Sequence, residues 1–466
     1  MRFYRLRERP CSRSIAAVWW QLYLCYMRPP VVVVLFLMSV GPAAFAGQIK
    51  AGYARTDVTP HEPVFMAGYD MRGTPSDGVH GNDKLNVRCL VFDDGSRKVA
   101  FVEGDVIEIR DTDEFRRRIS TATGIPFENI LLGDAHNHAA PSPSAKGENN
   151  WEREFGAALI GTVQKASANL QPVRLAAGQG HARIAMNRRQ VRAQDTDSYL
   201  TFDENNVSQS FGKFKTDQPE RIHEFGGVMR LGANPAGTID DAVDVVRVDT
   251  MDGKPLAAMI HYACHGTSLG GRNSKISGEW MGRMQEYLER QIHGVGAIYL
   301  QGAAGDINPR VVGGLDGYQD NIEVTWALGE EIGREVVRVY RTLQPEPMTA
   351  SLQIENADIK LPRTYRELVD DFKNTTVHAP TTAVRMGDLM WVTFPGELFH
   401  VIGQRVKSAC PATHAFLMGY TNGYIGYFPE QKAFAEGGYE PATSHLDPTA
   451  EGIYMRQITE LLTRFR

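Results

Sequence analysis

One unit recurs along this sequence: a short apolar run that ends in glycine and a polar side chain and leads toward a stretch of helical spacing. It occurs at 130–138, where Ile-Leu-Leu is followed by Gly-Asp-Ala-His-Asn-His, and again at 297–302 and 390–397. A buried strand followed by a helix is the building unit of α/β proteins. Polar groups that follow such strands gather at one edge of the sheet. The unit therefore constrains both the fold class and the place where chemistry is expected.

Further apolar runs complete the predicted fold. The runs at 87–93 and 98–103, and those at 243–248 and 256–261, are joined by turn sequences with Asp and Gly, and predict hairpins. Helices are predicted at 112–121, 154–170, 280–292, 321–343 and 449–465. Hairpins among strand–helix units favour a mixed sheet over a purely parallel one. We expect an α/β fold with a mixed β-sheet core and flanking helices, in a single large catalytic domain over residues 47–466.

One long stretch lacks such a pattern. Residues 190–226 are polar, with scattered phenylalanines. A segment of this length without periodicity is typical of a long surface loop. It is either an ordinary insertion or a lid over a site.

The first 46 residues have the features of an export signal. A ten-residue apolar run at 31–40 follows a basic region and leads to an Ala-Phe-Ala cleavage pattern before Gly47. The run is short for a bilayer span. A translation start at Met27 would give a signal of twenty residues, and an uncleaved anchor is the alternative. We expect an exported protein, periplasmic or secreted.

Charge and cysteine content exclude two classes of protein. From position 47 onward the chain has 44 basic and 54 acidic residues, a net charge of about −10, which argues against nucleic acid as a partner. The same part contains Cys89, Cys264 and Cys410. An odd number gives no disulfide framework, and at most one pair could form in an oxidising compartment. We expect Cys89 and Cys264 to be small buried apolar residues.

Four segments supply residue types that bind metals. They are the histidines at 136 and 138, Tyr-Ala-Cys-His at 262–265, Pro-Gly-Glu at 395–397 and the tyrosine-rich stretch 419–427. Histidine, glutamate and tyrosine together suffice for a catalytic zinc site. Singly, each segment has an ordinary explanation, because a strand-end histidine is usually structural, Pro-Gly-Glu forms turns and tyrosines usually pack.

The order of these segments resembles the catalytic domain of the neutral/alkaline, non-lysosomal ceramidases, which are zinc-dependent amidases. The resemblance begins with Asp-Val-Thr-Pro, Met-Ala-Gly-Tyr and Gly-Val-His at 57–60, 66–69 and 78–80. It continues through the segments 133–141, 187–188, 243–244, 252–255, 261–269, 302–309, 395–399, 419–427 and 438–440. No single motif is specific, but the ordered set spans residues 50–440.

The resemblance implies one zinc ion per chain, held by His136, His265, Glu397 and Tyr427. Tyr424, three residues from Tyr427, is the alternative tyrosine ligand. Such a ligand set with one position open to water describes a catalytic rather than a structural site.

The resemblance also implies the reaction. Zinc-bound water would attack the N-acyl amide bond of ceramide or of a related N-acyl lipid. His138 would move the proton from the water to the leaving nitrogen. Arg188 and Tyr439 would donate hydrogen bonds to the oxyanion, and Asp306 would orient a ligand histidine.

Two departures from the family pattern leave the substrate open. Asn308 stands where the family has a serine, which excludes a mechanism with that serine as nucleophile but leaves a zinc-bound water untouched. The sequence ends at Arg466, so we expect no C-terminal immunoglobulin-like domain. The alternatives are a zinc hydrolase of another amide or ester, such as an acylated sugar or peptide, and a secreted binding protein without turnover. We expect a small-molecule or lipid substrate, and peripheral membrane contact and oligomeric state stay open.

Overall fold

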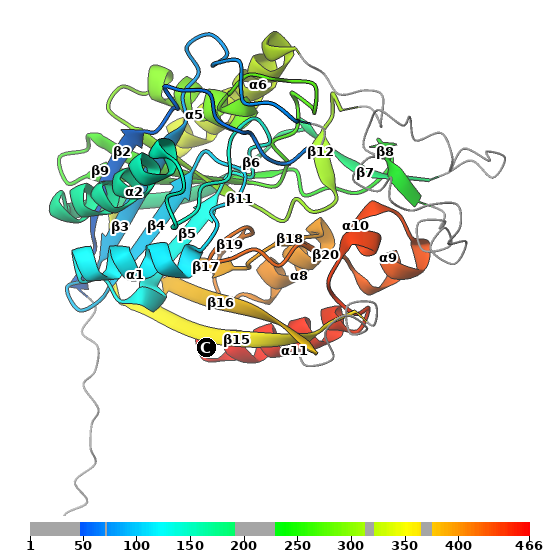
Figure 1. The fold of residues 1–466 in the computed structure, drawn as a ribbon. Helices are drawn as coiled ribbons and strands as arrows, with labels where there is room; N and C mark the ends of the chain where they lie inside the picture. Colours follow the sequence, from blue (N-terminus) through cyan, green and yellow to red (C-terminus); the bar gives the residue numbers. More distant parts are fainter. Residues whose placement is uncertain (1–46, 70–71, 192–228, 313–320, 365–374) are drawn as a thin grey trace, which may run out of the picture. The chain divides into compact units, whose positions relative to one another are not determined.

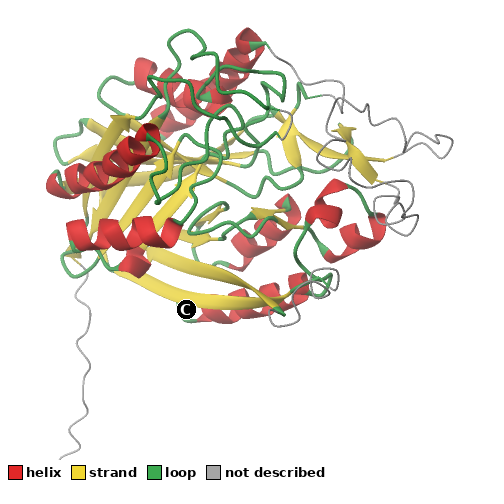
Figure 2. Cartoon of the chain, in the orientation of Figure 1, coloured by secondary structure: helices red, strands yellow, loops and turns green. Residues whose placement is uncertain are grey.

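A nine-stranded mixed sheet carries most of the apolar runs of the sequence (Figures 1 and 2). The computed structural model describes residues 47–69, 72–191, 229–312, 321–364 and 375–466. Along the sheet the strands follow the order β11 (Gly296–Gln301), β10 (Pro255–Tyr262), β9 (Ala242–Thr250), β6 (Gln171–His181), β2 (Lys50–Asp57), β3 (Asn86–Asp93), β4 (Lys98–Gly104) and β5 (Ile130–Asp134), with β13 (Glu346–Pro347) paired to β6.

A second, four-stranded sheet packs on one face of the first. Its order is β15 (Leu352–Pro362), β16 (Thr376–Met386), β17 (Leu389–Thr393) and β19 (His414–Met418). Trp391 of this sheet contacts Phe101 of the first, with ring centroids 5.0 Å apart, and stacks on Phe416 at 5.3 Å. One apolar core therefore lies between the two sheets.

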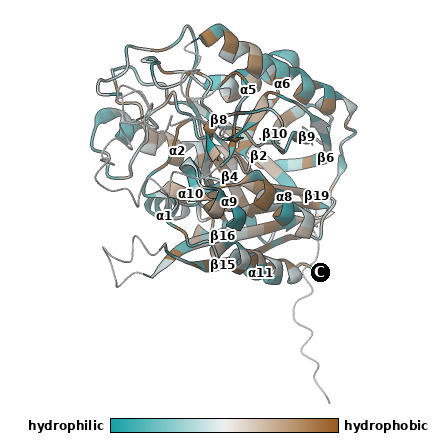
Figure 3. Ribbon diagram, turned by 90° about the vertical axis from the view of Figure 1, so that its right-hand side faces the viewer, coloured by the Kyte–Doolittle hydropathy of each residue, from teal (hydrophilic) through white to brown (hydrophobic). Residues whose placement is uncertain are grey.

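Helices cover the two outer faces. On the first sheet lie α1 (Thr112–Thr123), α2 (Asn150–Ala168), α5 (Glu279–Gln291) and α6 (Ile322–Thr342). On the second lie α8 (His400–Ala409) and α11 (Ala450–Thr463). Hydrophilic and hydrophobic residues alternate along these helices in Figure 3, as expected for helices with one buried face. The layers are thus helix, sheet, sheet and helix.

Short elements connect the layers and carry much of the site described below. They are β1 (Gly47–Gln48) paired with β14 (Thr349–Ala350), β7 (Ala185–Val191) between β8 (Met229–Asn234) and β12 (Ile307–Pro309), β18 (Glu397–Leu398) paired with β20 (Tyr427–Phe428), the 3₁₀ turn η1 (Phe127–Asn129), and the helices α9 (Gln431–Glu436) and α10 (Tyr439–Thr443).

The predicted fold class is confirmed. Both predicted hairpins form, as the antiparallel pairs β3–β4 and β9–β10. All five predicted helices occur, and α2 begins four residues before its predicted start because Asn149 accepts a hydrogen bond from the backbone N–H of Glu152. Cys89 and Cys264 are buried among apolar side chains, as predicted.

Two predictions fall outside the described residues. They are the signal sequence at 1–46 and, apart from its first two residues, the polar stretch 190–226. Among the described helices, none combines the length and the apolarity needed to cross a bilayer.

Candidate functional site

Loops after strands of the first sheet bring the predicted residues together. His136 and His138 follow β5, and His265 follows β10. Isolated bridges pair Asn137 with Gly266 and Gly133 with Thr421. These bridges draw the two histidine loops toward each other and toward the tyrosine-rich stretch.

Glu397 enters the same place from the second sheet. It begins β18, directly after the turn that follows β17, and pairs in parallel register with Tyr427 of β20. The carboxylate oxygen Oε2 of Glu397 lies 3.0 Å from Nε2 of His265 and 3.5 Å from Nε2 of His136. The structure therefore brings together three of the four predicted ligand side chains, all of them buried.

Hydrogen bonds to backbone carbonyls fix the tautomers of two histidines. Nδ1 of His136 lies 3.0 Å from the carbonyl of Ile107, and Nδ1 of His265 lies 2.7 Å from that of Ala304 and 3.0 Å from that of Ile307. Because a carbonyl only accepts, each Nδ1 carries the hydrogen and each Nε2 presents a lone pair. The two Nε2 atoms and Oε2 of Glu397 thus face one another, and none of the three brings a hydrogen to be shared with the others. A cation bound between them would satisfy all three lone pairs.

Charge states at this cluster agree with metal binding. Burial lowers the pKa of His136 to about 4, so its imidazole is neutral at physiological pH. Burial by itself would raise the pKa of Glu397, but His136, His265 and Arg188 outweigh it and hold the pKa below its usual range. Metal ligands must be neutral imidazoles and ionised carboxylates. The donor set therefore fits a zinc ion.

The backbone of the first histidine is strained. His136 has a φ of 53°, a region that residues other than glycine seldom adopt. Its N–H donates to Oδ1 of Asp134 at 3.1 Å. Strain of this kind persists only where surrounding contacts enforce it and is concentrated at functional sites.

His138 lies beside the two other histidines. Its Nε2 is 3.2 Å from Nε2 of His136, and the ligand nitrogens of the three histidines all lie within 4.8 Å of one another. Its ring packs edge-on against Tyr69, with centroids 5.1 Å apart, and burial lowers its pKa well below the usual value. Among the described residues its Nδ1 has no hydrogen-bond partner. The geometry is thus compatible with a neutral base and equally with a third nitrogen ligand.

Gly68 makes room for this histidine. Its φ is +91°, and a Cβ at this position would lie 2.4 Å from Cδ1 of Ile107 and 2.5 Å from Nδ1 of His138. Only glycine accepts both the conformation and the close approach.

Arg188 of β7 also reaches the cluster. Its Nη1 lies 3.2 Å from Nε2 of His265, and its Nε donates to Oε1 of Glu440 at 2.8 Å. The guanidinium lies 5.3 Å from the ring centroid of Tyr427 and 5.9 Å from that of Tyr439. Arg188 and Tyr439, the two predicted oxyanion donors, are therefore neighbours.

The tyrosines divide into two groups. Tyr424 donates a short hydrogen bond to Oε1 of Glu397, and Tyr420 donates to Oε2 at 3.4 Å. Tyr427 packs instead against Tyr439, with ring centroids 5.4 Å apart, and burial raises the pKa of Tyr427 well above its usual value. Tyr424 therefore contacts Glu397 directly, whereas Tyr427 lies beside Arg188 and Tyr439. The role of Tyr427 as a ligand stays a prediction.

The prediction for Asp306 is wrong. Its carboxylate accepts from Nδ1 of His400 at 2.7 Å, from the His400 N–H at 2.9 Å and from Nδ2 of Asn187 at 3.1 Å, while backbone carbonyls orient His265. Asp306 therefore fixes the start of α8 rather than a ligand histidine. His400 was not foreseen, because one histidine at a helix start gives no signal of its partner.

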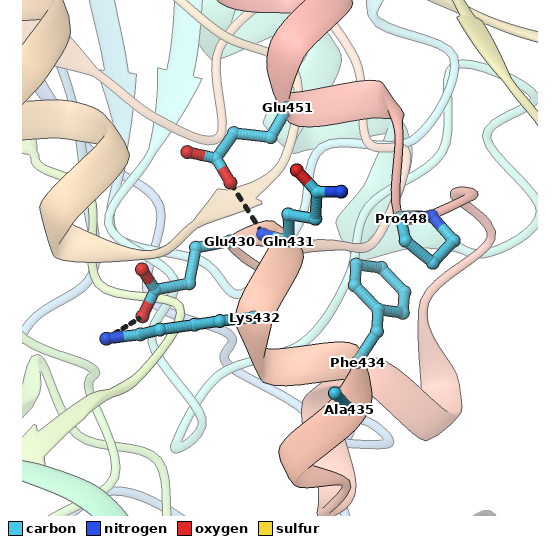
Figure 4. Close-up of a pocket in the computed structure, with 7 residues that line it drawn as sticks. All are labelled: Glu430, Gln431, Lys432, Phe434, Ala435, Pro448 and Glu451. Carbon is cyan, nitrogen blue, oxygen red and sulfur yellow. Dashed lines mark hydrogen bonds and ion pairs between the residues drawn. The ribbon is translucent and has the colours of Figure 1, made fainter.

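A surface pocket lies elsewhere. Its volume is about 750 Å³, and none of its lining residues belongs to the histidine cluster. Figure 4 shows these lining residues on α9 and near the start of α11. The pocket contains Lys432 and Glu430, which form an ion pair at 3.0 Å.

Comparison with known protein families matches residues 49–326 to the family described as "Neutral/alkaline non-lysosomal ceramidase, N-terminal". The chain belongs to this family. Two curated relatives come from Dictyostelium discoideum. Neutral ceramidase A is 23% identical over 366 residues, which cover 70% of this chain and 46% of that protein. Neutral ceramidase B is 27% identical over 164 residues, 30% of this chain and 23% of that protein. The matches thus span less than half of the length of these relatives.

Solved structures share the fold. A ceramidase complexed with C2 superposes with a TM-score of 0.69 at 17% identity, over 90% of this chain and 75% of that chain. The neutral ceramidase from Pseudomonas aeruginosa gives a TM-score of 0.68 at 18% identity, over 90% and 74%. At these identities the likeness establishes the fold of the chain and the predicted α/β class.

Proposed function

We propose that this protein is an exported, zinc-dependent amidohydrolase that cleaves the N-acyl amide bond of ceramide or of a related N-acyl lipid. Membership of the ceramidase family supports the reaction class, and the names of the relatives support the substrate. One observation carries the proposal: Nε2 of His136, Nε2 of His265 and Oε2 of Glu397 face one another as buried acceptors without a shared proton.

His136, His265 and Glu397 would hold the ion, with Tyr427 as the fourth protein ligand. Imidazole nitrogen and carboxylate oxygen are ligands that zinc prefers, and three or four protein ligands with one open position are typical of catalytic sites. When bound, zinc polarises a carbonyl and makes hydroxide available at neutral pH.

The side chains around the ion would transfer the proton and stabilise the charge on the carbonyl oxygen. His138, neutral because burial lowers its pKa, would take a proton from the attacking water and pass it to the amide nitrogen as the C–N bond breaks. Arg188 and Tyr439 would donate hydrogen bonds to the carbonyl oxygen as it gains negative charge. The products are a fatty acid and a free amine.

Elemental analysis beside a hydrolysis assay tests the proposal. Purified protein and His136→Ala are compared for zinc content and for turnover of a fluorogenic N-acyl sphingosine. We expect about one zinc per chain and turnover in the wild type, both lost in the variant. Zinc with no turnover of this substrate would refute the substrate class, and no binding of added zinc would refute the metal site.

The proposal of export has its own test. The full chain is expressed in a bacterium with a periplasm, and the mature protein is sequenced from its N-terminus. We expect cleavage before Gly47, and an intact N-terminus on the recovered protein would contradict export by a cleaved signal.

A further inference from the structure

Asn308 is a buried amide side chain beside the histidine cluster. It lies in β12 with 6% of its surface exposed. Its Oδ1 accepts from Nη1 of Arg188 at 3.2 Å and from Oγ1 of Thr267 at 3.4 Å. The same Nη1 of Arg188 lies 3.2 Å from Nε2 of His265. One guanidinium nitrogen therefore links the asparagine to a predicted ligand.

The orientation of this amide follows from its partner. A guanidinium donates hydrogen bonds and cannot accept them. The atom that faces Arg188 must therefore be the oxygen, and Nδ2 of Asn308 points away from the guanidinium. Among the described residues no hydrogen bond involves Nδ2 of Asn308. Because Nδ2 itself is not one of the fully buried atoms, this donor remains open to a ligand.

We propose that Asn308 is a further catalytic residue, whose Nδ2 donates a hydrogen bond to the oxygen of the scissile carbonyl. The inference rests on the proposed amide hydrolysis. Arg188 and Thr267 hold the amide in place before substrate arrives, so the donor needs no reorganisation during the reaction. Fixed donors of this kind stabilise the charge that develops in the transition state.

The chemistry of an amide side chain limits what Asn308 can do. Water adds its oxygen to the carbonyl carbon, and the carbonyl oxygen gains the negative charge that Nδ2 would stabilise. Collapse of this intermediate re-forms the carbonyl and breaks the C–N bond, while His138 passes to the nitrogen the proton that it took from the attacking water. Because the nitrogen of a carboxamide is a poor nucleophile, no covalent acyl-enzyme forms at position 308.

Three variants test the proposal: Asn308→Ala, Asn308→Asp, and Asn356→Ala on the exposed face of β15 as the control. We expect Asn308→Ala to lower kcat for an N-acyl sphingosine about 10²- to 10³-fold with little change in KM. Zinc content should stay at the wild-type value, and the thermal midpoint should fall slightly because the buried Arg188 and Thr267 lose an acceptor. Asn308→Asp keeps the acceptor for Arg188 but loses the donor, so its kcat should also fall. The control Asn356→Ala should keep the wild-type kcat.

A thioamide substrate separates a contact with the carbonyl from a structural role. Sulfur accepts hydrogen bonds more weakly than oxygen, so replacement of the carbonyl oxygen should slow the wild type more than Asn308→Ala. The ratio of amide to thioamide turnover should therefore fall at least tenfold in the variant. An unchanged ratio, or a kcat for Asn308→Ala within threefold of wild type, would overturn the proposal. If Asn308→Ala does not fold, the ratio measured for Asn308→Asp decides.

The proposed function and this inference fail in different ways. A wild type that binds zinc but hydrolyses no N-acyl amide overturns the proposed function and this inference with it. An active wild type with an equally active Asn308→Ala overturns the inference alone.

Discussion

Replacement of Glu440 by glutamine should destabilise the fold by about 3 kcal/mol, because a buried arginine loses its carboxylate. Glu440 is 1% exposed and accepts from Arg188 at 2.8 Å and from Arg189 at 3.0 Å, and both arginines are buried. Breaking a buried pair from one side costs about 3–5 kcal/mol. Arg189 keeps Glu436 at 3.1 Å, so the lower end of that range applies.

Thermal unfolding measures this effect. The unfolding entropy of about 2.1 cal/mol/K per residue, over roughly 420 residues, converts 3 kcal/mol into a midpoint lower by about 3 °C. Asp252→Asn is the matched control, because it removes the carboxylate of an exposed ion pair with Lys254, and we expect no measurable shift. A Glu440→Gln midpoint equal to that of the control would refute the reasoning.

Three further predictions follow from single contacts. Tyr424→Phe frees one oxygen of Glu397 and should weaken zinc binding about 10- to 100-fold in competition with a chelator; unchanged affinity would contradict it. Gly68→Ala should lower both the thermal midpoint and turnover, whereas Gly73→Ala, which has open space around its Cβ position, should change neither; equal behaviour of the two would count against the close packing at this turn. Burial alone would lower the pKa of His400, but its partner Asp306 outweighs burial and raises the pKa. The stability that the His400–Asp306 pair contributes is therefore complete below the unfolded pKa of about 6.5, and it is lost as pH rises through the folded pKa. His400→Gln should therefore cost more stability at about pH 5.5 than at about pH 9 in urea unfolding, and equal costs would contradict that sign.

The sequence predicted those elements whose apolar residues form a continuous run or show a clear period. Strands β3, β4 and β5 are buried on both faces and read as continuous apolar runs. Strands β6 and β15 were missed because exposed and half-exposed residues interrupt their buried positions. The packing of the second sheet on the first depends on contacts such as Trp391 with Phe101, which join residues almost 300 positions apart and leave no local pattern.

The site was predicted by residue type and order rather than by geometry. His136, His265, Glu397 and Arg188 were named from motifs, and the structure brings them together. The hydrogen bond from Tyr420 to Glu397 had no signal of its own within a stretch rich in tyrosine. Tautomers were also beyond sequence reasoning, because they depend on which carbonyls face each Nδ1.

The zinc content and turnover of His136→Ala and His138→Ala, beside wild type, test the central claim most directly. The account predicts about one zinc per wild-type chain and hydrolysis of an N-acyl sphingosine. His136→Ala should lose both, whereas His138→Ala should keep its zinc and lose about 10²- to 10⁴-fold in kcat. Loss of zinc in His138→Ala would make that histidine a ligand instead of the proton carrier, and full turnover in His136→Ala would contradict the account as a whole.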